Sequence, residues 1–106
     1  MSHIDVDFEQ VVTAEQRATE ANAARKAKLS AECRRGIVAV ADETAQINLT
    51  AAASAGLLSA GQMQIWIAAL GWVSAMRGEY ARAALEGDEP IWPDLPAGVA
   101  DLVELF

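Results

Sequence analysis

The chain has 106 residues, of which 53% are hydrophobic and only 6% aromatic, and its formal charge at pH 7 is −7. A chain of this length forms one domain, and its negative charge argues against general nucleic-acid binding, which depends on lysine and arginine neutralising phosphates. Cys33 is the only cysteine and His3 the only histidine, so an internal disulfide is excluded and neither a Cys-His nor a Ser-His-Asp site is expected.

The first segment, residues 1–12, is predicted to be an extended arm. Ile4, Val6 and Phe8 alternate with acidic residues, and this period of two is typical of a short strand with one apolar face. Because the rest of the sequence reads as helical, such a strand has no partner within the chain. We therefore expect it to lie against the helices or to add to a sheet edge of another protein, with Ile4, Val6 and Phe8 as partner-binding residues.

A first helix is predicted over about residues 13–55. Thr13 and Gln16 have the spacing of a capping box at its start, and no proline follows until Pro90. Apolar side chains, with one threonine among them, recur at steps of three or four residues, as on one face of a helix. This stripe consists of Leu29, Cys33, Ile37, Val40, Thr44 and Ile47.

A second helix is predicted over about residues 60–86. Gly56 is expected to end the first helix in the left-handed conformation. Ser59 and Gln62 form another capping box, and Gly87 is expected to end the second helix. The predicted inner face of this helix consists of Met63, Trp66, Ile67, Leu70, Val73, Met76 and Tyr80.

The two helices are expected to pack as an antiparallel αα-hairpin over residues 13–87, because the connection between them is short. A hairpin has one inner face, yet Trp66 and Trp72 lie about 120° apart around the second helix. Trp72 and Ile65 are therefore predicted to form a second apolar face for oligomerisation or docking. The alternative is that Trp72 only covers the edge of the hairpin core.

The last segment, residues 88–106, is acidic and contains all three prolines, which exclude a continuous helix and favour an extended arm. Residues 97–106 are expected to end it as a short helix. Large apolar side chains spaced along the segment are predicted to bind a partner: Ile91, Trp92, Leu102 and Phe106. The alternative is that the segment folds back over the hairpin and covers Trp72. The predicted fold is all-α, a hairpin with an extended arm at each end.

Charged residues are distributed unevenly. Between Thr44 and Met76 there is none, so this part must be buried in the protein, in a partner or in a membrane. It contains serines and glutamines and has no basic cluster beside it, so packing in protein is favoured over a holin-like membrane protein. Residues 14–36 carry a net charge of +3 and residues 86–106 carry −6, so these two parts can pair head to tail between subunits.

Two stretches, VTAEQRATEANAARKAKLSAE and LSAGQMQIWIAALGWVSAMR, carry a T-x-E-Q start at residues 13–16 and Trp72 shortly before Arg77. Over about residues 12–82 the chain resembles the helical part of short bacteriophage tail proteins, including the C-terminal helices of tail-fibre assembly proteins. It lacks the N-terminal β domain of the latter, and Met76 stands where an aromatic residue is expected before the arginine. The resemblance therefore implies a small structural component of the tail and brings no catalytic residues.

We expect a non-enzymatic structural or assembly protein of a phage or phage-like tail, made in the host cytoplasm and located in the virion. Tail, baseplate or fibre subunits, or copies of the chain itself, are the expected partners, because two alanine-rich helices bury too little apolar area to be stable alone. No cofactor, metal, nucleic acid or membrane is expected to bind. The alternatives are a tail-fibre assembly chaperone absent from the virion and a small acidic phage-encoded inhibitor.

Overall fold

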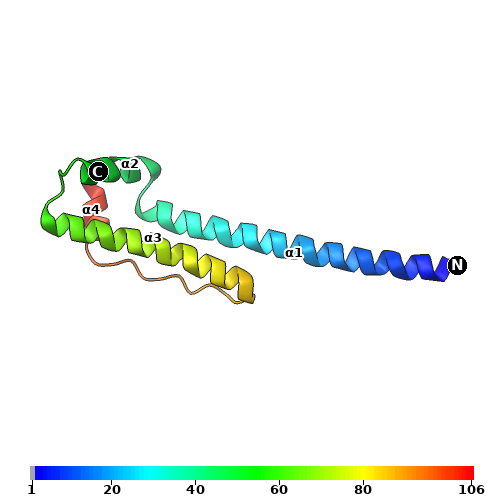
Figure 1. The fold of residues 1–106 in the computed structure, drawn as a ribbon. Coiled ribbons are helices and arrows are strands. Elements are labelled where there is room, and N and C mark those ends of the chain that lie inside the picture. The colour runs from blue at the N-terminus through cyan, green and yellow to red at the C-terminus, as the bar shows by residue number, and fades with distance from the viewer. Residues whose placement is uncertain (1) are drawn as a thin grey trace.

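The computed structural model describes the backbone of residues 2–106 and the side chains of residues 13–106. Within this range the chain forms helices and no strand, which confirms the all-α class. The four helices in the range are α1 (Ser2–Val40), α2 (Glu43–Ser54), α3 (Ala60–Glu86) and α4 (Val99–Glu104) (Figure 1).

Helix α1 occupies the whole N-terminal part of the described backbone. It begins at Ser2, so residues 2–12 of the predicted extended arm 1–12 are helical, and residue 1 lies outside the described range. Thr13 lies within the helix and not at its N-cap. No proline or glycine occurs in that segment to stop a helix. The side chains of Ile4, Val6 and Phe8 lie outside those that are described, so their role in partner binding stays a prediction.

The single helix predicted over residues 13–55 is divided in two. Helix α1 ends at Val40 and α2 begins at Glu43. Asp42 between them has an extended backbone (φ −68°, ψ 171°), and its carboxylate accepts a hydrogen bond from the backbone N–H of Ala45 at 2.8 Å. This is N-cap geometry, which starts a new helix in a new direction.

Both ends of α3 are as predicted. The hydroxyl of Ser59 accepts a hydrogen bond from the N–H of Gln62 at 3.1 Å, and the Gln62 side chain accepts one from the N–H of Ser59 at 2.9 Å. Gly87 ends α3 with φ at 75°, and Gly56 makes the turn after α2 with φ at 72°. Both glycines are in the left-handed region, where other residues are strained.

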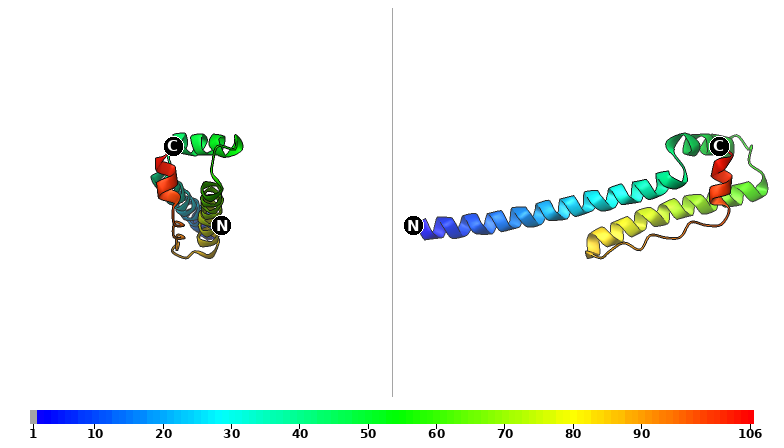
Figure 2. Two further views of the ribbon diagram at one scale, coloured as in Figure 1. Left: turned by 90° about the vertical axis from the view of Figure 1, so that its left-hand side faces the viewer. Right: turned by 180° about the vertical axis from the view of Figure 1, so that it is seen from behind.

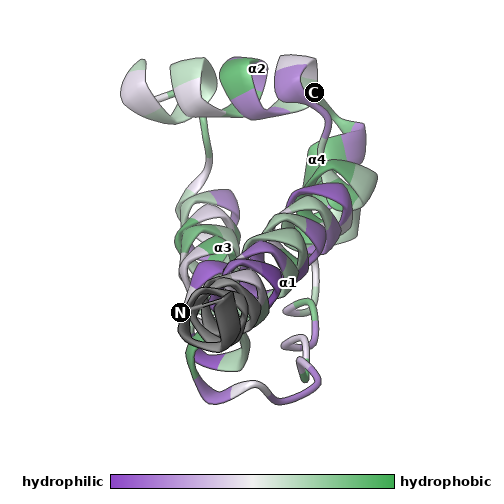
Figure 3. Ribbon diagram, turned by 90° about the vertical axis from the view of Figure 1, so that its right-hand side faces the viewer, coloured by the Kyte–Doolittle hydropathy of each residue, from purple (hydrophilic) through white to green (hydrophobic). Residues whose placement is uncertain are grey.

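Helices α1 and α3 run antiparallel beside each other, and α2 lies across one end of this pair (Figures 1 and 2). Residues 88–98, which we call the return arm, then run back along α3 to α4, and α4 contacts both α3 and α2. Viewed along α1, α2 and the return arm lie on different sides of the helix pair (Figure 3). The molecule measures 76 × 22 × 18 Å, because the N-terminal part of α1 extends well beyond α3.

The core lies where α1, α3 and the return arm meet. Cys33, Trp72 and Met76 are buried at its centre. Gly36 allows α1 and α3 to approach closely, because a Cβ atom at this position would lie 2.8 Å from Cε of Met76. The partly buried side chains packed around the centre are Ile37, Val40, Val73, Tyr80, Trp92 and Leu95.

The predicted inner faces of the helices are partly wrong. On α3 Ile67 is 58% exposed and Leu70 is 49% exposed, and on α2 Ile47 is 68% exposed. Trp72, which the sequence placed on the flank, is only 8% exposed. The prediction assumed one neighbour for the second helix, whereas α3 packs against α1 on one side and against the return arm on another. The buried face is therefore turned toward Trp72.

Candidate functional site

The return arm is fixed to α3 over Trp72. The indole Nε1 of Trp72 donates a hydrogen bond to the carbonyl oxygen of Pro93 at 3.0 Å, and Trp92 and Leu95 pack against the core cluster that contains the indole. A buried indole N–H needs such an acceptor. The alternative in which the chain folds back and covers Trp72 is therefore the one observed, and the expectation of an outward-facing Trp72 is wrong.

Most of the other predicted contact residues are also covered by the chain itself. Ile65 is half-buried against the glycine that precedes α4, since a Cβ atom there would lie 3.1 Å from its Cδ1. Leu102 is buried, and Trp92 and Phe106 are half-buried. Ile91 differs from these residues because it is 80% exposed. The side chain of Ile91 is thus still available to a partner.

A charged cluster, missed by the sequence analysis, fixes the start of the return arm. Arg82 pairs with Glu79 at 2.6 Å within α3. It also contacts Glu86 at 2.7 Å and Asp88 at 3.0 Å. A carboxylate oxygen of Glu79 accepts a hydrogen bond from the backbone N–H of Ile91 at 2.9 Å, so the cluster joins the end of α3 to the arm. The one sequence signal for this cluster is the spacing of the acidic residues, since Glu79 lies three residues before Arg82 and Glu86 lies four residues after it.

The cluster changes the acidity of its members. The pKa of Glu79 is lowered from its ordinary value of 4.5 to about 2, chiefly by the hydrogen bond from Arg82 and then by the one from the N–H of Ile91. The pKa of Arg82 is raised, most of all by its hydrogen bond to Glu79. Both shifts favour the charged forms that hold the arm in place.

Replacing Glu79 with glutamine is expected to reduce the sensitivity of the fold to acid. Because the folded-state pKa of Glu79 lies below the unfolded value, its contribution is present above about pH 4.5 and is lost as the pH falls toward about 2. Urea unfolding at about pH 7 and about pH 3 measures this, with the exposed Glu104→Gln as the control. The loss of stability in acid should be smaller in E79Q than in the wild type and unchanged in E104Q. Equal losses in all three proteins would contradict the prediction.

Arg25 connects α1 to the C-terminal end of α3. Its Nη1 donates a hydrogen bond to the carbonyl oxygen of Ala83 at 2.9 Å, and its Nη2 donates to the carbonyl oxygen of Asp88. The carbonyl oxygen of Ala83 also accepts a hydrogen bond from the N–H of Gly87 at 3.0 Å, so Arg25 adds a second hydrogen bond there and links α1 to the end of α3 and the start of the return arm. On the N-terminal side of Arg25, every described side chain from Thr13 to Ala24 is exposed.

An apolar groove with a volume of about 250 Å³ lies where the four helices meet. Leu70 in its lining is 49% exposed, and Arg77 is its one charged lining residue. Its apolar lining includes Ile37, Val40, Leu49, Trp66, Leu70, Val73, Val99 and Val103. The helices bring these side chains together from parts of the sequence that are far apart. The groove can hold an apolar side chain.

The one thiol of the chain is not activated. Burial raises the pKa of Cys33, although the charges of Arg77 and Arg34 act in the opposite direction. A raised pKa disfavours the thiolate, which is the reactive form of cysteine. Cys33 is therefore a small packing residue of the core.

Among the described residues, no three His, Cys, Asp or Glu side chains are grouped so that they could hold a metal ion. None of the helices in the described range is both long and apolar enough to cross a membrane. Comparisons with protein families, with curated proteins and with solved structures found no match to this chain.

Proposed function

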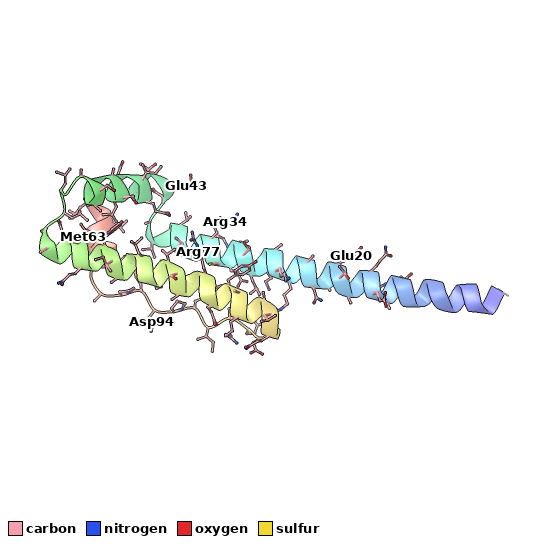
Figure 4. The ribbon with its side chains drawn as sticks, in the orientation of Figure 1. Glu20, Arg34, Glu43, Met63, Arg77 and Asp94 are labelled. Atoms are coloured by element: carbon pink, nitrogen blue, oxygen red, sulfur yellow. The ribbon has the colours of Figure 1, made fainter. Side chains whose placement is uncertain are left out.

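We propose that this chain is a non-enzymatic assembly protein that binds another protein through helix α1. The observation that supports this most is the projection of the N-terminal part of α1 from the rest of the molecule, residues 25–106, which we call the body. The helix has 39 residues, and the turns around Glu20 extend beyond the end of α3 (Figure 4). The side chains from Thr13 to Ala24 are all exposed.

A helix that is exposed on all sides gains nothing from tertiary packing, and isolated helices are only marginally stable in water. The body does not need the projecting part, because α3, the return arm and the second half of α1 complete the core around Trp72. Residues 13–28 are rich in alanine, and small side chains allow a second helix to approach closely. A helical partner protein therefore suits this surface.

We further propose the tail of a phage or phage-like particle as the setting. The support is the resemblance of residues 12–82 to the helical part of phage tail proteins. In that setting the partners are tail, baseplate or fibre subunits, and the protein is a component of the virion that contributes binding and no chemistry.

Mass spectrometry of purified particles tests the setting. Peptides of this chain are expected in particles washed with high salt, in a constant ratio to the other tail proteins. Presence in the cell lysate together with absence from the washed particles would contradict a structural role. That result would favour an assembly chaperone or an inhibitor instead.

A further inference from the structure

A second groove, with a volume of about 420 Å³, lies between α1 and α3 and has a positive rim. Arg34 of α1 and Arg77 of α3 line it from its two sides (Figure 4). Within the described part of the chain, neither guanidinium forms an ion pair or a hydrogen bond. The remaining lining includes apolar groups and two hydroxyl groups, from Ser30, Cys33, Ile37 and Tyr80. The groove is therefore suited to a segment that carries carboxylates beside an apolar side chain.

The return arm has this chemistry. Ile91 is 80% exposed, and Glu89 and Asp94 on either side of it are exposed carboxylates that form no ion pair within the described range. Pro90 and Pro93 favour an extended backbone, and the hydrogen bonds to α3 hold the arm in that shape. A segment that is already ordered loses little conformational entropy when it binds.

The arm of a molecule cannot enter the groove of the same molecule. Arg77 follows Trp72 by five residues, which places it about 140° away around α3. The arm is held on the Trp72 side, and Figure 4 shows Asp94 across α3 from Arg34 and Arg77. A second copy of the chain has no such restriction.

We propose that the groove of one copy binds the return arm of a second copy, so that copies associate head to tail. Ile91 enters the apolar part of the groove, and Glu89 and Asp94 face Arg34 and Arg77. Such a contact joins two different surfaces, so it repeats into linear chains unless the copies close into a ring. The inference rests on the proposed role in assembly and names the chain itself as one of the partners.

The test is the mass of the purified full-length protein in solution, measured by sedimentation equilibrium. The wild type is expected to form dimers and longer chains in about 50 mM NaCl and to dissociate in about 500 mM, because salt screens surface charges. The charge-reversed variants R34E/R77E and E89K/D94K are each expected to lose at least about tenfold in the association constant at low salt. An equal mixture of the two variants is expected to associate again, since each reversed surface then meets its complement.

R17E/K28E is the matched control. It changes the net charge by the same amount as R34E/R77E, at exposed positions that lie roughly 140–160° from Cys33 around α1. It should associate as the wild type does, and circular dichroism checks that all variants keep their helices. A wild type that is monomeric at both salt concentrations, an equal loss in the control, or a mixture that stays monomeric would overturn the proposal. These experiments measure association between copies of the chain. None of their results tests whether α1 binds another protein, which is measured separately with that protein.

Discussion

Replacing Trp72 with alanine is expected to lower the free energy of unfolding by about 3–5 kcal/mol. The indole is 8% exposed and packs with Cys33 and Met76, so the variant loses apolar contacts and leaves a cavity. The carbonyl oxygen of Pro93 also loses its hydrogen-bond donor. Since a whole domain is stable by only about 5–15 kcal/mol, we expect the return arm to detach and the body to be largely unfolded in mild urea. Urea titration followed by circular dichroism measures this change.

Two further variants separate the causes. Trp72→Phe keeps an aromatic ring but removes the N–H donor, so a smaller loss of about 1–2 kcal/mol is expected. Ile67→Ala removes an apolar side chain from the same helix at a position that is 58% exposed, and it should change stability by less than about 1 kcal/mol. The sequence placed Trp72 on a second apolar face for oligomerisation or docking, and the buried indole reverses that expectation. Equal losses in W72A and I67A would contradict the observed packing.

Removing residues 2–20 is expected to abolish binding of the partner protein and to leave the stability of the body unchanged. The deletion ends before Arg25, which holds α1 to the end of α3, so the packed half of the helix keeps its contacts. Within the deleted segment, the described side chains from Thr13 to Glu20 are exposed, and none of them belongs to the core cluster. Both the full-length and the shortened chain, with the same N-terminal tag, are purified from cells that produce particles.

Co-purifying proteins and the melting temperature are compared for the two chains. Partners that are present with the full-length chain should be absent with the shortened one, at the same melting temperature within a few degrees. A shortened chain that melts much lower would show that the projecting turns belong to the fold. A shortened chain that retains all partners would place the binding surface on the body.

The parts of the fold that were predicted from sequence are those with local signals. Helix α3 (Ala60–Glu86) is capped by Ser59 and Gly87, because a capping box and a left-handed glycine act within a few residues. The break at Asp42 also has a local cause, but the apolar stripe continues past it, and periodicity favoured one long helix. The alternation at the N-terminus favoured a strand, and nothing in that segment stops a helix.

The placement of Trp72 was beyond sequence reasoning for a physical reason. Hydrophobic periodicity shows which face of a helix is apolar, but it does not show how many neighbours the helix has. The neighbour that covers Trp72 is a proline-containing segment 21 residues further along the chain, joined to it by a hydrogen bond from the indole. The same segment covers Ile65 near α4 and leaves Ile91 exposed. Tertiary packing, and not a local sequence signal, therefore decides which of the predicted contact residues are buried and which are exposed.

Amide hydrogen exchange of α1, in the purified chain and in the complex with its co-purified partner, tests the central claim most directly. In the isolated chain at high salt, residues 13–24 should exchange rapidly, and the turns around Cys33 and the Trp72 part of α3 should be protected. In the complex, residues 13–24 should become protected while the body is unchanged. Slow exchange of residues 13–24 in the isolated chain, or no gain of protection in the complex, would contradict binding through the projecting helix.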